Sequence, residues 1–467
     1  MGSISHPKST FSPASTLPLF LDGKQITLAK TFDVVSPVTH QVLYKCSAIT
    51  EEDATRAVDS AERALKSWSQ TKPDFRRDIF LRAADLMEKR ADDMFYFSHT
   101  EIGVNREMFN HEHGVAVGAC RSIAGLIQVA TTSTSPVIAA AGRSALVVKE
   151  PYGVVLGISP WNIPHVLALR ACLQPLAMGN TVVLKGPEAA PGTMWGIASA
   201  LHDAGLPAGC LNTLYHDPKD AAIITSKLIA HPAIKKINFT GSTRVGSIIA
   251  AEAGKYLKPT LMELGGKAPA IVCEDADLAK AARGCVDGAF INSGQICMST
   301  ERIIVNSKVA EEFRKALLLA LKDFSGTQGW DVAQLVSDVA VINNTKLITD
   351  ALSKGAQLLA DDMGHCHGIE SASKLRPTII TGVRKDMDIY YKKSFGPVVS
   401  LLVVDSDSDA IAIANDTEYG LASAVYTEDL RRGMRIAKEI ESGAVHINSM
   451  TVHDEPALPH GGVKESG

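Results

Sequence analysis

Short apolar strands alternate with predicted helices over the middle of this 467-residue chain, and the alternation limits the possible folds strongly. The predicted strands are residues 154–158, 181–185, 211–214 and 236–239, and the helices between them are 164–178, 192–204 and one ending near 230. Strands that are apolar along their whole length are typical of parallel sheets with helices on both faces. The pattern predicts a doubly wound α/β domain, in which ligands bind at the carboxyl ends of strands.

A second α/β unit follows from about residue 259. Strands are predicted at residues 268–273, 302–305, 398–404 and 444–448, and helices at 277–290, 343–354 and 407–415. A chain of this length exceeds what one simple core accommodates. We therefore expect two α/β domains with a cleft between them.

The first 152 residues contain a different set of elements. Asp22-Gly23 predicts a hairpin turn, and Thr50 begins a helix with a capping box to Asp53. Further helices are predicted at residues 75–90, 92–102 and 112–131. Residues 143–152 alternate and are rich in β-formers, which predicts extended segments that leave the compact body. Residues 1–15, rich in Ser, Thr and Pro, are predicted to be a disordered tail.

Composition argues against several classes of protein. The net charge of −4 gives no reason to expect nucleic acid or an anionic membrane as a partner. We see neither a signal-peptide pattern nor an apolar run of membrane-spanning length. The eight cysteines include no CxxC pair, which indicates reduced thiols in a cytoplasmic protein. Two clusters, His111-Glu112-His113 and His365-Cys366-His367, suggest either a metal or solvated loops, and we favour loops and no metal.

One cysteine lies in a distinctive segment. Cys297 ends Gly294-Gln295-Ile296-Cys297, between the predicted helix 277–290 and the strand 302–305. Glycine and small polar neighbours at such a junction can hold a thiol open to a substrate. The alternative is a small buried hydrophobe, the commoner role of a lone cysteine.

Other polar groups follow predicted strands. The segments are Pro160-Trp161-Asn162, Lys185-Gly186-Pro187-Glu188, Phe239-Thr240-Gly241-Ser242-Thr243 and Glu263-Leu264-Gly265-Gly266-Lys267. Gly241 allows close backbone approach, and amides at the start of the following helix can meet a pyrophosphate. Residues 239–246 lack the GxGxxG pattern, so an ordinary strand-to-helix turn is the alternative there.

In this order along the chain, these motifs and Phe395-Gly396-Pro397 resemble the aldehyde dehydrogenase superfamily from about residue 20 to the last residue. The resemblance implies that Cys297 is the thiol nucleophile, Asn162 an oxyanion donor and Glu263 the general base. A free thiol has a pKa of about 8.5, so its site must favour ionisation. The thiolate would attack an aldehyde carbon, and water deprotonated by Glu263 would hydrolyse the resulting thioester.

The resemblance also implies a nicotinamide dinucleotide as the hydride acceptor. Its predicted contacts are Ser159, Trp161, Lys185, Glu188, Gly241, Ser242, Gly246, Leu264, Lys393 and Phe395. Lys185 and Glu188 would hold the adenosine ribose, and Ser242 the pyrophosphate. Because the Glu188 carboxylate would repel a 2′-phosphate, we expect NAD in preference to NADP.

Residues 451–464 resemble the aromatic-aldehyde branch, of the salicylaldehyde, vanillin and benzaldehyde dehydrogenase type. The predicted substrate-pocket residues are Arg170, Ile296, Met298 and Val452. Arg170 faces a substrate phenol or carboxylate in one interpretation and is paired within the protein in the other. An aliphatic aldehyde, and acyl transfer to coenzyme A in place of water, are alternatives that the branch motif and Glu263 disfavour.

The sequence departs from the family pattern at Lys393, where relatives carry a glutamate that accepts hydrogen bonds from the nicotinamide ribose. An ammonium has no acceptor and repels the oxidised ring. We predict weaker cofactor positioning and slower hydride transfer, a penalty of about 1.5–3 kcal/mol or roughly ten-fold or more. The alternative is that Lys393 points to solvent and water bridges the ribose.

A second departure concerns assembly. Relatives continue beyond the position of Gly467 with a strand that pairs with a neighbouring subunit, and residues 131–152 would be the other half of this β-type oligomerisation extension. With the extension incomplete, we expect a truncated chain or altered assembly in place of the family's homodimer or homotetramer.

The sequence as a whole predicts NAD-dependent oxidation of an aromatic aldehyde to the carboxylic acid. The alternative is a catalytically impaired homologue with a binding or structural role, favoured by Lys393. The predicted parts are a dinucleotide-binding domain (16–130 and 153–260), the oligomerisation segment (131–152), a catalytic domain (261–450) and a return segment (451–467).

Overall fold

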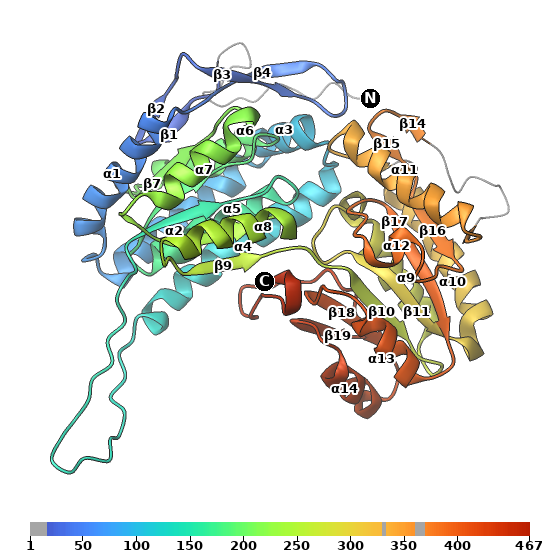
Figure 1. The fold of residues 1–467 in the computed structure, drawn as a ribbon. Coiled ribbons are helices and arrows are strands. Elements are labelled where there is room, and N and C mark those ends of the chain that lie inside the picture. The colour runs from blue at the N-terminus through green and yellow to red at the C-terminus, as the bar shows by residue number, and fades with distance from the viewer. Residues whose placement is uncertain (1–15, 329–332, 360–368) are drawn as a thin grey trace.

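Two seven-stranded sheets organise the chain in the computed structural model, which describes residues 16–328, 333–359 and 369–467 (Figure 1). The predicted disordered tail and the cluster around Cys366 lie outside the described residues. Each sheet belongs to one α/β unit, so the two units predicted from the strand–helix alternation are confirmed.

The first sheet has the strand order β2-β1-β7-β6-β5-β8-β9. Its strands are β1 (Leu19–Leu21), β2 (Lys24–Ile26), β5 (Val154–Ile158), β6 (Thr181–Lys185), β7 (Leu211–Leu214), β8 (Ile234–Thr240) and β9 (Thr260–Glu263). The pairs from β7 to β9 are parallel, and β5, β6 and β7 are buried along their whole length. This burial explains why these strands are apolar throughout.

Helices of the first unit surround this sheet (Figure 1). They are α1 (Glu51–Trp68), α2 (Pro73–Lys89), α3 (Ala91–Ile102), α4 (Arg106–Ala130), α5 (Pro164–Ala177), α6 (Pro191–Asp203), the 3-10 turn η1 (Pro218–Asp220), α7 (Ala221–Ala230) and α8 (Thr243–Lys255). The predicted capping box at Thr50 and Asp53 is present, and Asp22 and Gly23 adopt the positive φ that a tight hairpin requires.

The second sheet has the order β13-β16-β17-β11-β10-β18-β19. Its strands are β10 (Ala268–Val272), β11 (Thr300–Asn306), β13 (Gln357–Leu358), β16 (Thr378–Thr381), β17 (Val398–Val404), β18 (Ala422–Tyr426) and β19 (Ala444–Ile447). The helices are α9 (Leu278–Phe290), α10 (Ala310–Gln328), α11 (Asp338–Ser353), α12 (Asp388–Tyr391), α13 (Asp407–Asn415) and α14 (Leu430–Glu439), with the 3-10 turns η2 (Ile291–Gly294), η3 (Ser307–Val309) and η4 (Lys464–Ser466).

Some elements differ from the sequence prediction. Helix α4 begins at Arg106, six residues before the predicted start, because the Asn105 side chain caps it by accepting from the Met108 amide at 2.8 Å. A two-stranded ribbon, β3 (Thr31–Val35) with β4 (Val42–Ser47), and a small sheet, β12 (Ala333–Gln334), β15 (Lys374–Leu375) and β14 (Ile369–Ser371), were not predicted.

Residues 131–152 form an extended arm that projects from the body (Figure 1). Its two limbs meet in an isolated bridge between Thr134 and Val147. The apolar side chains of Leu146 and Val148 on this arm are 69% and 57% exposed. The predicted extended segments that leave the compact body are therefore present, but they form no regular strands.

The last residues return to the junction between the two sheets. The Ser466 hydroxyl donates to the Gly265 carbonyl at 2.7 Å, and the Leu264 amide donates to the Ser466 carbonyl at 2.8 Å. These bonds hold the connection from β9 to β10, which carries the chain from the first sheet to the second.

One described helix, α4, is long and apolar enough to cross a membrane by length and composition. Core helices of soluble proteins pass the same test. Helix α4 packs against α2 and α5, and its residues Phe109, Ala116 and Cys120 are fully buried in the core. The structure therefore supports a core helix.

Candidate active site

A strained turn presents Cys297. The backbone of Asn292, Ser293 and Gly294 is left-handed, with φ of 49°, 59° and 70°. Three such residues in a row are costly in a chain of L-amino acids and persist only where the surroundings enforce them. At Gly294 a Cβ would lie 2.1 Å from the Gly396 carbonyl oxygen, so only glycine fits beneath the 395–397 segment.

Buried amides enforce this turn. The Asn162 side-chain amide donates to the Gln295 carbonyl at 2.8 Å, and Asn292 Nδ2 donates to the Asn162 carbonyl at 2.9 Å. Gln295 Oε1 accepts from the Val336 amide at 3.0 Å. Asn162 thus joins the segment after β5 to the turn that precedes Cys297. The Asn162 side-chain amide has two hydrogens, and only one of them is needed for the bond to the Gln295 carbonyl.

The Cys297 thiol differs from the other described cysteines. The structure describes seven cysteines; the other six are buried, whereas Cys297 is partly exposed. Burial raises the pKa of the Cys297 thiol, and the charges of Glu263 and Asp454 raise it further, while those of Lys393 and Arg170 lower it. The thiol therefore lies among four charged side chains, two of each sign.

Glu263 is the last residue of β9 and is buried. Its Oε2 atom makes no hydrogen bond with the described residues, and His460 Nε2 lies 3.2 Å from it. His460 Nδ1 lies 3.7 Å from Asp454, which in turn forms an ion pair with Arg170. Neither His460 nor Asp454 was predicted as a site residue.

The Arg170 pair decides between the two interpretations of this residue. Its guanidinium is held by Asp454, so in this structure Arg170 is paired within the protein. Among the other predicted pocket residues, Ile296 is fully buried, whereas Met298 and Val452 are 6% and 9% exposed.

A cavity of about 250 Å³ lies beside these charges. One part of its lining is apolar and comes from α4 and α5: Val115, Ala119, Ile123, Val166 and Leu169. The polar part includes Arg170, Glu263, Asp454 and His460. An apolar wall opposite a few polar groups fits a flat ring that carries polar substituents.

Several of the predicted cofactor residues lie at one edge of the first sheet, whereas Lys393 and Phe395 come from the second unit. Parallel pairing sets the ends of β5, β6 and β8 side by side, with Ile158 opposite both Lys185 and Phe239. Ser159, which follows β5, has a buried hydroxyl without a hydrogen-bond partner among the described residues. This edge is the carboxyl end of the strands, where ligands of such sheets bind.

The start of α8 has the features of a phosphate site. Ser242 caps the helix by accepting from the Val245 amide at 3.4 Å. Gly246 lies against Leu264, since a Cβ there would lie 2.4 Å from a Leu264 methyl, and a Cβ at Gly241 would lie 2.4 Å from the Phe239 ring. A cavity of about 510 Å³ borders Gly246 and Leu264. The helix dipole favours an anion here.

Glu188 lies beside a lysine and a histidine. Lys185 Nζ lies 3.3 Å and His216 Nε2 2.9 Å from its carboxylate. Burial alone would raise the pKa of Glu188, but the neighbouring His216 ring and the charge of Lys185 bring it down to about 2. The sequence interpretation missed His216, which follows β7, the strand next to β6.

Lys393 points toward Cys297. Its amine donates to the Cys297 carbonyl at 3.0 Å and lies 5.2 Å from the centre of the Phe395 ring. The alternative in which Lys393 points to solvent is therefore wrong for this structure. Phe395, at a φ of 45°, meets Trp161 edge to face at 5.8 Å.

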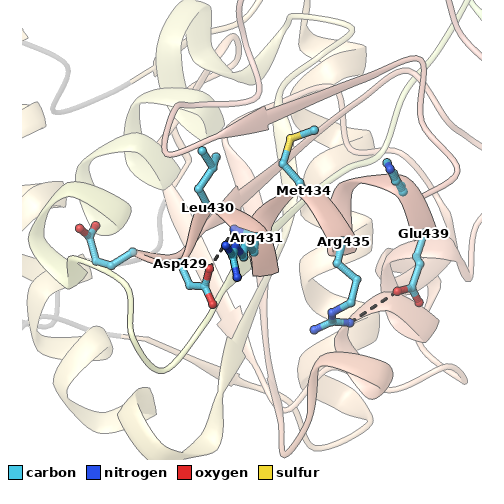
Figure 2. Close-up of a pocket in the computed structure, with 8 residues that line it drawn as sticks. Asp429, Leu430, Arg431, Met434, Arg435 and Glu439 are labelled. Atoms are coloured by element: carbon cyan, nitrogen blue, oxygen red, sulfur yellow. Dashed lines mark hydrogen bonds and ion pairs between the residues drawn. The ribbon is translucent and has the colours of Figure 1, made fainter.

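The expectation of a solvated loop at His111-Glu112-His113 is wrong, because this cluster lies within α4 and Glu112 and His113 are buried. The described residues contain no group of three or more His, Cys, Asp or Glu side chains that could hold a metal ion. A large open depression of about 1090 Å³ lies along α14 (Figure 2). Its lining combines exposed Leu430 and Met434 with the charges of Asp429, Arg431 and Arg435, and it includes none of the predicted site residues.

The two sheets of mostly parallel strands and the helices around them define an α/β protein, with Cys297 on a strained turn ahead of β11. Residues 24–467 match the sequence model of the Aldehyde dehydrogenase family. The chain is 40% identical to a vanillin dehydrogenase of Pseudomonas sp. (strain HR199 / DSM 7063) over 97% of this chain and 93% of that protein. It is 38% identical to a salicylaldehyde dehydrogenase of Pseudomonas putida over 94% of this chain and 90% of that protein.

Solved structures agree with this placement. The crystal structure of a salicylaldehyde dehydrogenase from Pseudomonas putida G7, complexed with salicylaldehyde, superposes with a TM-score of 0.92 at 37% identity, over 97% of this chain and 93% of that one. The chain therefore belongs to the aldehyde dehydrogenase family, a family of oxidoreductases that use nicotinamide cofactors, and it is similar to members that act on aromatic aldehydes.

Proposed function

We propose that this protein oxidises an aromatic aldehyde to the carboxylic acid, with NAD as the hydride acceptor and Cys297 as the nucleophile. The observation that carries the proposal is that Glu263, Arg170 and Asp454, whose charges act on the Cys297 thiol, also line a cavity with one apolar wall. The vanillin and salicylaldehyde dehydrogenases among its relatives support an aromatic substrate.

Cys297 would act first. Its sulfur attacks the aldehyde carbon, and the carbonyl oxygen becomes an oxyanion that the Asn162 amide and the Cys297 backbone amide can stabilise. The strained turn and its buried amides fix the sulfur relative to these donors, so little reorganisation is needed during the reaction.

The bound NAD would accept a hydride from the thiohemiacetal, leaving a thioester on Cys297. The residues at the carboxyl end of the first sheet fit this cofactor, because the orphaned Ser159 hydroxyl, the α8 start and the Lys185–Glu188 pair lie at one edge. Glu188 supports NAD over NADP, since its carboxylate stays ionised and would repel a 2′-phosphate.

Glu263 would complete the cycle. As a buried carboxylate with an orphaned oxygen, it can accept a proton from a water molecule that attacks the thioester. The acid then leaves, and Cys297 receives the proton that returns it to its starting form.

On this proposal, residues 16–130 and 153–263 form the dinucleotide-binding domain and residues 264–450 the catalytic domain, with residues 451–467 returning to the junction. The boundary lies beyond the expected residue 260, because β9 pairs with β8 in the first sheet. The arm of residues 131–152 would join copies of the chain, and its exposed Leu146 and Val148 support that role.

Lys393 favours a second candidate, a homologue with low turnover that mainly binds its ligands. The amine stands where relatives place a glutamate that contacts the nicotinamide ribose. A panel of benzaldehyde, salicylaldehyde, vanillin and aliphatic aldehydes, each with NAD and NADP, separates the two. Steady NADH formation with an aromatic aldehyde that disappears in Cys297→Ala supports the enzyme, and its absence with every pair supports the binding protein.

A further inference from the structure

A buried ion pair between Lys267 and Glu301 holds the backbone on both sides of Lys393. Lys267 Nζ donates to the Lys392 carbonyl at 2.9 Å, and the Ser394 amide donates to Glu301 at 3.0 Å. Lys267 and Glu301 are 2.8 Å apart, and their side chains are 0% and 2% exposed. A buried pair with its remaining groups hydrogen-bonded is a rigid support.

This support leaves the charge of Lys393 uncompensated. Among the described residues, no carboxylate lies within 4.0 Å of Lys393 Nζ, the limit for the ion pairs found elsewhere in the protein. Glu301 is neutralised by Lys267, so the group of two lysines and one glutamate has a net charge of +1. Burial lowers the pKa of Lys393, and the charges of Glu301 and Cys297 act in the opposite direction.

The amine is aimed at the reacting residue. Its hydrogen bond ends on the carbonyl oxygen of Cys297, and its charge acts on the thiol of the same residue. The backbone of Gly266 passes the same carbonyl, where a Cβ would lie 2.6 Å from the oxygen. Lys393 and Gly266 thus both contact the Cys297 carbonyl, and the hydrogen bond keeps the ammonium beside the backbone of the residue that carries the thiol.

We propose that the Lys393 ammonium stabilises the thiolate of Cys297 and so replaces, at this position, a cofactor contact with activation of the nucleophile. The inference rests on the proposed function in assigning Cys297 as the nucleophile. No bond is made or broken by Lys393 itself: it remains an ammonium throughout and acts by its charge, as a positioning residue.

Other charged groups face the same sulfur. Arg170 on α5 acts in the same direction as Lys393, whereas Glu263 on β9 and Asp454 in the 451–467 segment oppose it. Arg170 is paired with Asp454, and His460 lies beside Glu263. Lys393 is thus the cation near Cys297 whose charge no carboxylate offsets at ion-pair distance in the described structure.

The test measures the thiol alone. The full-length protein, without aldehyde or NAD, is alkylated with iodoacetamide over a range of pH, and the modified Cys297 peptide is quantified by mass spectrometry. Lys393→Met and Lys393→Gln remove the charge, and Lys393→Arg keeps it. Lys392→Met is the matched control, because Lys392 is exposed and pairs with Asp388 at 2.7 Å.

We expect both neutral variants to raise the apparent pKa of Cys297 by about 1 or more and to slow its alkylation near neutral pH roughly tenfold. Lys393→Arg and Lys392→Met should retain the wild-type profile. Superimposable profiles for wild type, Lys393→Met and Lys393→Gln would overturn the inference.

A loss of alkylation at every pH in the neutral variants would also overturn it, since that indicates a blocked thiol and not a shifted ionisation. The result of the alkylation experiment is independent of whether the protein oxidises aldehydes. Aldehyde oxidation that depends on Cys297 can persist while the alkylation profiles coincide, and the profiles can differ in a protein that oxidises no aldehyde.

Discussion

His460 Nε2 lies 3.2 Å from a carboxylate oxygen of Glu263, and that oxygen accepts no hydrogen bond within the described structure. The imidazole is held in turn near Asp454, at 3.7 Å from its second nitrogen. The predicted general base is therefore supported by a side chain from the opposite end of the chain.

Replacing His460 with Phe keeps a ring of similar size and removes the nitrogen beside Glu263. We expect kcat to fall about tenfold, because the polar neighbour that positions the Glu263 carboxylate at 3.2 Å is lost, with a smaller change in KM. If thioester hydrolysis becomes rate-limiting, rapid mixing should show a burst of NADH. His453→Phe is the control, since His453 pairs with exposed Glu455 instead. An unchanged kcat for His460→Phe would contradict the role.

Replacing Glu188 with Gln tests cofactor preference. The amide cannot repel a 2′-phosphate, so the ratio of kcat/KM for NAD to that for NADP should fall about tenfold, equivalent to ~1.4 kcal/mol. Because the pKa of Glu188 is about 2, the wild-type preference should not weaken on mild acidification. A ratio that is the same in Glu188→Gln and wild type would show that selectivity resides elsewhere.

His113 makes stability depend on pH. Burial and the charge of His165 lower its pKa from 6.5 to about 4, so the folded protein holds it neutral while the unfolded chain protonates it. Its stabilising contribution is complete above pH 6.5 and is lost as pH falls toward 4. We expect the free energy of unfolding to drop by about 2 kcal/mol between about pH 7.5 and pH 5 from this residue.

His113→Phe isolates that contribution. The ring stacks on Phe109 at 5.0 Å, and a phenyl group can keep this contact. Urea unfolding at both pH values should show a smaller acid-induced loss in the variant than in wild type. Equal losses would mean that His113 is not the residue that senses pH.

The arm of residues 131–152 should mediate self-association. Leu146→Asp with Val148→Asp places two charges on its exposed apolar side chains, which disfavours their burial between subunits. Light scattering after size-exclusion chromatography should show a lower mass than for wild type. Leu319→Asp is the matched control, with a side chain 65% exposed on α10. A mass unaffected by the arm substitutions would exclude this segment from the interface.

Local patterns predicted much of the fold. The apolar runs that became β5, β6 and β7 are buried along their whole length, and the Thr50 capping box is present, because burial of a strand and capping of a helix are both encoded within a few residues. The start of α4 was not predicted, because the residues after the Asn105 cap begin with two charged side chains, Arg106 and Glu107, and not with the apolar spacing used to recognise helices.

Long-range pairings could not be predicted in the same way. Arg170 and Asp454 are 284 residues apart, and nothing in either neighbourhood indicates the pair. The direction of Lys393 depends on the buried Lys267–Glu301 pair, which fixes its backbone. The left-handed turn at Asn292 and Ser293 depends on Asn162 and Gln295, so its strain has no local signal.

The most direct test of the account is the fate of the Cys297 sulfur. Glu263→Gln should accumulate the thioester, because hydrolysis lacks its base while acylation continues. Incubation with an aromatic aldehyde and NAD should yield close to one NADH per active site and a matching acyl mass on the Cys297 peptide. NADH formation without that adduct, or activity that survives Cys297→Ala, would contradict the account.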